Sequence, residues 1–84
     1  MPSTTHTVQL TVEQVQELNQ KLSTMRHDIN NHLSLMLAAT ELIRHKPQMA
    51  ERMMATLCEQ PSKITDSIAK FSAEFEATFH LKQP

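Results

Sequence analysis

The sequence has 84 residues, of which 39% are hydrophobic, and it contains no glycine, tryptophan or tyrosine. A chain this short forms one small domain at most and buries little surface alone, which favours oligomerisation. Its formal net charge of -1 argues against nucleic-acid binding, which needs a clustered basic face.

The beginning of the chain is rich in threonine and shows no periodicity, so we expect a flexible arm over residues 1–10. A helix is predicted to begin at Val12, because Thr11 and Gln14 occupy the N-cap and N3 positions of a capping box. This helix should span about residues 12–46.

Apolar residues in this first segment recur at spacings of three and four, which is typical of a helix that is buried along one stripe. They are Val12, Val15, Leu18, Leu22, Met25, Ile29, Leu33, Met36 and Ile43. Positive charge is favoured at the end of a helix, and Arg44, His45 and Lys46 supply it.

A second helix is predicted over about residues 47–80, because Pro47 suits the first helical position and the helical spacing resumes after it. Its apolar residues are Met49, Met53, Leu57, Ile64, Ile68, Phe71, Phe75 and Phe79. Pro61 removes one backbone hydrogen bond and crowds the preceding turn, which predicts either a kink or a break. The apolar spacing keeps its phase across Pro61, so we favour the kink. Residues 81–84 should form a tail.

The short connection between the two segments predicts an all-α fold, in which an antiparallel two-helix hairpin forms one domain over residues 11–80. Two amphipathic helices bury only one seam between them. A symmetric homodimer would cover the remaining apolar surface and produce a four-helix bundle.

His27 is the most informative polar residue of the first helix. At about 100° per residue it points away from Met25 and Ile29, and Asn31, one turn on, shares its face. Asp28 is its neighbour on the flank. A neutral imidazole is a nucleophile, a carboxylate can orient the ring or accept its proton, and an amide can hold a water molecule. The same residues would also suit a solvated helix face without chemistry.

One segment resembles the H-box of the dimerisation and phosphoacceptor domain (DHp, HisKA-like) of sensor histidine kinases, namely His27-Asp28-Ile29-Asn30-Asn31. The resemblance covers about residues 15–76. In the second helix it depends on Leu57, Lys63, Ile64, Ile68, Phe71 and Ser72. Two positions depart from the family pattern. His32 stands where a proline or an apolar residue often bends the first helix, and Pro61 interrupts the second.

The resemblance implies that His27 is the phosphoacceptor, that Asp28 assists phosphoryl transfer, and that Asn31 positions water during dephosphorylation. It implies a phosphotransfer module of two-component signalling that exchanges phosphate with an aspartate of a response-regulator receiver. The expected partners are a second copy of the chain, the receiver, and a kinase ATP-binding domain. The expected location is the cytoplasm.

We expect no cofactor within the chain itself, because the phosphate-binding loops of ATP sites rely on glycine. ATP and Mg²⁺ would act only through a separate kinase domain or partner. The chain would then be either the bundle of a longer kinase or a standalone histidine phosphotransferase.

Other functions fit the sequence less well. We expect no metal site, because His27 and His32 are five positions apart, whereas a zinc pair on a helix needs i and i+4. The apolar stretches are too short to cross a membrane. The single cysteine, Cys58, is compatible with a reducing compartment. An inert homodimerisation scaffold of the same fold and an unrelated coiled-coil adaptor remain the alternatives.

Overall fold

The computed structural model describes residues 9–79. Over this range the chain forms helix α1 (Val12–His45), a 3₁₀ turn η1 (Pro47–Met49) and helix α2 (Ala50–Phe79), and it contains no strand. The all-α prediction is therefore confirmed. Most of the predicted arm, the whole predicted tail and His80 lie outside the described residues.

The start of α1 is determined locally by the predicted capping box. The Gln14 backbone N–H donates to Thr11 Oγ1 at 3.1 Å, and the Thr11 backbone N–H donates to Gln14 Oε1 at 2.8 Å. Two of the backbone donors that a helix N-terminus leaves without partners are thereby satisfied. Glu13 adds negative charge in the first turn, where the helix dipole favours it.

Replacing the capping residue, as in Thr11→Ala, should lower the free energy of unfolding by about 0.5–2 kcal/mol, because the Gln14 N–H loses its acceptor. Urea denaturation measures this change. Thr65→Ala is the matched control, because Thr65 Oγ1 donates to the Pro61 carbonyl on an exposed part of α2. An equal loss in both variants would contradict a specific contribution of the cap.

The chain reverses direction over very few residues. Lys46 has φ -135° and ψ 78°, and its backbone N–H donates to the Leu42 carbonyl at 2.7 Å. Pro47 then begins η1, in which the Met49 N–H donates to the Lys46 carbonyl at 2.9 Å. The second α-helix begins at Ala50, later than expected, because the fixed φ of a proline suits a 3₁₀ turn as well as an α-helix.

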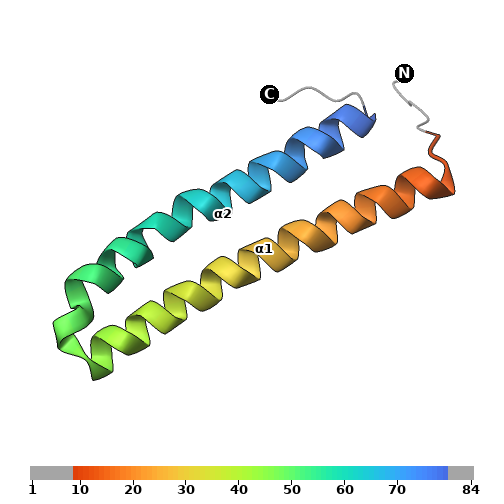
Figure 1. The fold of residues 1–84 in the computed structure, drawn as a ribbon. Coiled ribbons are helices and arrows are strands. Elements are labelled where there is room, and N and C mark those ends of the chain that lie inside the picture. The colour runs from red at the N-terminus through yellow and green to blue at the C-terminus, as the bar shows by residue number, and fades with distance from the viewer. Residues whose placement is uncertain (1–8, 80–84) are drawn as a thin grey trace, which may run out of the picture.

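Helices α1 and α2 lie side by side and run in opposite directions (Figure 1). The described chain is elongated, with extents of 63 × 27 × 17 Å and a radius of gyration of 19.0 Å. A compact chain of this length would have a radius of gyration of roughly 12 Å. Helix α2 continues through Pro61 without a break.

The apolar stripe predicted for α1 divides into two faces. Val12, Val15, Leu22 and Leu33 are exposed in the single chain, so α2 alone does not cover the whole predicted stripe. The half-buried and buried residues follow a neighbouring line along the helix. They are Leu18, Lys21, Met25, Asp28, His32, Met36, Ala39 and Leu42, with Ile29 and Ile43 next to this line. This line forms the seam with α2, and its polar members were not expected there.

The seam has a small buried centre. Ala39 and Gln60, each 2% exposed, are the only buried residues within residues 9–79. Near the end of α2 that lies away from the turn, three phenylalanine rings follow one another. Their centroids are 6.1 Å apart for Phe71 and Phe75 and 4.6 Å apart for Phe75 and Phe79.

Neither helix has the length and apolarity that a bilayer crossing requires over the described range.

Candidate functional site

His27 and Asn31 both lie on the exposed outer surface of α1. At about 100° per residue, His27 lies about 160° from Met25 in the seam and about 120° from Leu33 on the exposed apolar face. Its ring makes no hydrogen bond or ion pair with any other residue of the range 9–79. A reacting group can therefore approach the imidazole from solvent.

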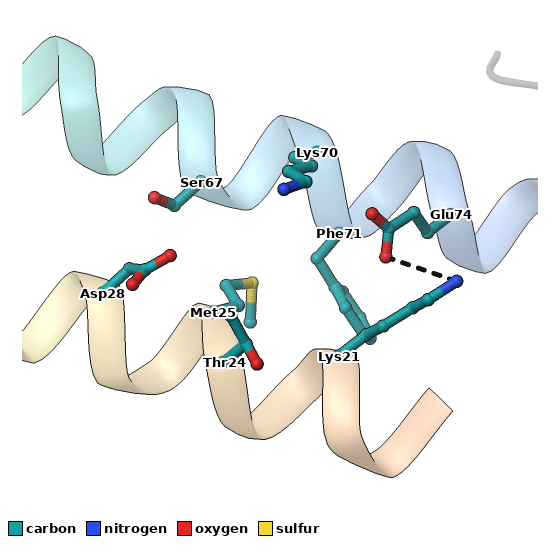
Figure 2. A pocket seen from close by; sticks show the side chains of 8 residues that line it. All are labelled: Lys21, Thr24, Met25, Asp28, Ser67, Lys70, Phe71 and Glu74. Carbon is teal, nitrogen blue, oxygen red and sulfur yellow. Dashed lines mark ion pairs between the residues drawn. The ribbon is translucent and has the colours of Figure 1, made fainter. Parts of the chain in front are cut away.

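Asp28 takes a different direction from His27. It is half-buried, and its carboxylate lines a cleft between α1 and α2 with a volume of about 260 Å³ (Figure 2). Adjacent helix residues do not face each other, and here the carboxylate is directed toward α2. The structure thus places His27 and Asn31 on one face and Asp28 on another.

Two ion pairs at one end of this cleft share the ammonium group of Lys21. Lys21 Nζ lies 3.1 Å from Glu17 Oε1 within α1 and 3.7 Å from Glu74 Oε2 on α2. The hydrogen bond to Glu17 raises the pKa of Lys21 above its ordinary value, the charge of Glu74 adds to this rise, and desolvation opposes it. Lys21 and Glu74 are half-buried and remain in contact with solvent, and their charged atoms are 3.7 Å apart, so this ion pair contributes little to stability.

A hydrogen bond between His32 and Gln60 crosses the seam slightly more than one turn beyond His27. His32 Nδ1 lies 2.8 Å from Gln60 Oε1, and Gln60 Nε2 donates to the Thr56 carbonyl at 3.1 Å. Because the amide oxygen of Gln60 can only accept, His32 Nδ1 is the donor in this contact. The sequence pattern did not predict this pair, although Met25, Asp28 and His32 are spaced by three and four, which indicates that they share one face of the helix.

Breaking this contact should destabilise the chain. Gln60→Leu leaves the half-buried His32 Nδ1 without its acceptor, so the free energy of unfolding should fall by about 1–3 kcal/mol. The double variant His32→Leu with Gln60→Leu should lose less than the sum of the two single losses, because neither partner is then left unpaired.

Urea denaturation of the four proteins at one fixed concentration measures this coupling. Gln16→Leu is the control for the substitution itself, because Gln16 is exposed on α1 and should change stability by no more than about 0.5 kcal/mol. Strictly additive losses would exclude a coupled pair.

No group of three or more His, Cys, Asp or Glu side chains within the described part of the chain is placed to hold a metal ion. Cys58 is exposed on α2. No protein-family model matches the chain, and comparison with curated proteins and with solved structures finds no match either. The functional assignment therefore depends on the residues of the site and on their geometry.

Proposed function

We propose that the chain is a phosphoacceptor and phosphotransfer module of two-component signalling, phosphorylated on His27 and acting in the cytoplasm. It exchanges the phosphoryl group with an aspartate of a response-regulator receiver. The observation that supports this most strongly is the position of His27, which is exposed on α1 and lies about 160° around the helix from Met25 and about 120° from Leu33. An acceptor in this position stays accessible after both faces have been covered.

The chemistry needs only a nucleophilic ring nitrogen. In transfer from a receiver, an imidazole nitrogen of His27 attacks phosphorus, the new N–P bond forms, and the O–P bond to the receiver aspartate breaks. The aspartate leaves as a carboxylate. Positive charge develops on the ring during attack, and we assign Asp28 the role of stabilising it electrostatically, since its carboxylate does not face the ring directly.

We propose that Asn31 acts when the chain removes the phosphoryl group from a phosphorylated receiver. It lies one turn after His27 on the same exposed face. Its amide group is able to hold a water molecule for hydrolysis of the receiver aspartyl phosphate. ATP and Mg²⁺ would reach His27 only through a separate kinase ATP-binding domain, which would bind to the same surface.

We further propose that the hairpin of α1 and α2 forms a homodimeric four-helix bundle. Nine large apolar residues are exposed in the single chain, which is unusual for a stable monomer. An apolar groove beside the seam is formed by Leu33, Met36, Leu37, Thr40 and Leu57. On α2, Met54, Ile68 and Phe75 are exposed at spacings of seven and fourteen, so they lie along one line of the helix.

This surface is best matched by a second copy of the chain. The exposed apolar residues run along both helices rather than around one end, which suits a partner of the same length and the same amphipathic pattern. A symmetric pair would bring the two α1 faces and the two α2 faces into one core.

An inert scaffold of the same fold is the second candidate. The orientation of Asp28 favours it, because the carboxylate is directed into the cleft and not toward His27. Such a protein would dimerise and bind a receiver without exchanging phosphate.

Phosphoryl transfer distinguishes these two functions. The chain is incubated with phosphorylated receivers and, separately, with an active kinase catalytic domain and ATP. We expect acid-labile, base-stable phosphate on the 84-residue chain and loss of phosphate from the receiver. Receiver binding without any label on the folded chain would support the scaffold and contradict phosphotransfer.

A further inference from the structure

The cleft between α1 and α2 contains polar groups that have no partner among residues 9–79. Asp28, Ser67 and Lys70 line it, and none of them forms a hydrogen bond or an ion pair within the described chain. Other hydroxyl groups of α2 donate to carbonyls of their own helix, namely those of Thr56, Ser62, Thr65 and Thr78. The Ser67 hydroxyl is thus available to a ligand.

The unpartnered groups converge from both helices. Figure 2 shows the Asp28 carboxylate on α1 and the Ser67 hydroxyl on α2 directed toward each other, with Lys70 next along α2 from Ser67. Met25 and Phe71 provide apolar surface between the helices. The cleft therefore combines an anion, a cation and a hydroxyl group with an apolar floor.

The charges around the cleft are balanced. Its lining contains two lysines, Lys21 and Lys70, and two acidic residues, Asp28 and Glu74. Lys21 and Glu74 are paired at one end, at 3.7 Å, whereas Asp28 and Lys70 form no ion pair within residues 9–79. A simple anion would be repelled by Asp28, and a simple cation by Lys70, whereas a molecule that carries both charges satisfies both residues.

We propose that this cleft binds a free aliphatic α-amino acid. Its ammonium group would pair with Asp28, its carboxylate with Lys70 and Ser67, and its side chain would lie over Met25 and Phe71. The volume of about 260 Å³ is below the range of about 300–1,000 Å³ that is usual for larger ligands, so it suits a small metabolite. This site does not depend on phosphotransfer by His27.

Three related molecules test the requirement for two charges. L-Leucine carries both, L-leucinamide retains only the ammonium group, and 4-methylpentanoate retains only the carboxylate. Each is titrated into the ¹⁵N-labelled full chain, and the backbone amide shifts of Thr24, Ser67 and Lys70 are followed. We expect saturable shifts with L-leucine at a Kd of about 1 mM, and binding at least about tenfold weaker for each of the other two.

Lys70→Gln should weaken L-leucine binding by about tenfold or more, because one charge-assisted contact is lost. Lys63→Gln is the matched control, since Lys63 is an exposed lysine of α2 that does not line the cleft. Both positions are exposed, so both variants should keep the helical spectrum of the wild type. Equal affinity for L-leucine and 4-methylpentanoate, an equal effect of the two lysine variants, or no saturable shift with L-leucine would each overturn the proposal.

Discussion

His27→Gln is expected to reduce phosphate incorporation into the chain to below detection with every donor. Glutamine retains polarity and helix propensity, but its amide nitrogen is not nucleophilic, so no N–P bond can form. His27 is exposed and forms no hydrogen bond or ion pair with the rest of the described chain, so helicity and oligomeric state should be unchanged. Radiolabel transfer, circular dichroism and sedimentation measure the three properties in one preparation.

The control for this variant is His45→Gln, which removes an exposed histidine from the end of the same helix. His45 Nε2 lies 3.2 Å from Glu41 Oε2, and its loss should leave phosphate incorporation at the wild-type level. Label that persists in His27→Gln would place the acceptor elsewhere in the chain. Loss of the dimer in that variant would show that His27 belongs to an interface.

Leu33→Asp combined with Leu37→Asp should convert the proposed dimer into a monomer. The two side chains are 46% and 67% exposed in the single chain, so the substitutions create no clash within it. In a four-helix bundle both carboxylates would be buried among apolar residues, and each buried, unpaired ion costs on the order of several kcal/mol. Sedimentation equilibrium should give a mass equal to one chain instead of two.

A leucine on another side of α1 provides the control. Leu35 is 49% exposed and lies about 160° around the helix from both Leu33 and Leu37. The same substitution, Leu35→Asp, should leave the dimer intact. If Leu35→Asp dissociates the dimer and the double variant of Leu33 and Leu37 does not, the interface lies on a different face of α1. A wild-type chain that sediments as a monomer would exclude the bundle.

The elements that sequence reasoning predicts well are those specified by neighbouring residues. Thr11 and Gln14 define the start of α1 because a capping box needs only residues three apart. Pro47 ends the first helical pattern for an equally local reason. The outward direction of His27 follows from helix geometry alone, since a position two residues away from both Met25 and Ile29 must point to the opposite side.

The features that the sequence predicts poorly are those that depend on how the two helices pack against each other. The apolar spacing of α1 predicts one stripe, but periodicity alone does not specify which apolar residues a given partner covers, and α2 leaves Leu22 and Leu33 exposed. Asp28 and His32 lie in the seam, where a hydrophobic pattern gives no signal for polar residues. The contact between His32 and Gln60 depends on the relative register of two helices, which only the folded chain defines.

The short connection between α1 and α2 determines how the pair opens. Only Lys46 and η1 separate the two helices, so closing this loop costs little conformational entropy. Toward the far end, Lys21 and Glu74 are joined by a half-buried, solvent-accessible ion pair of 3.7 Å that adds little stability. Separation should therefore begin at the open end, and protection from amide hydrogen exchange should increase toward the turn. The cleft beside Asp28 would then open in brief local fluctuations while the helices remain joined around Ala39.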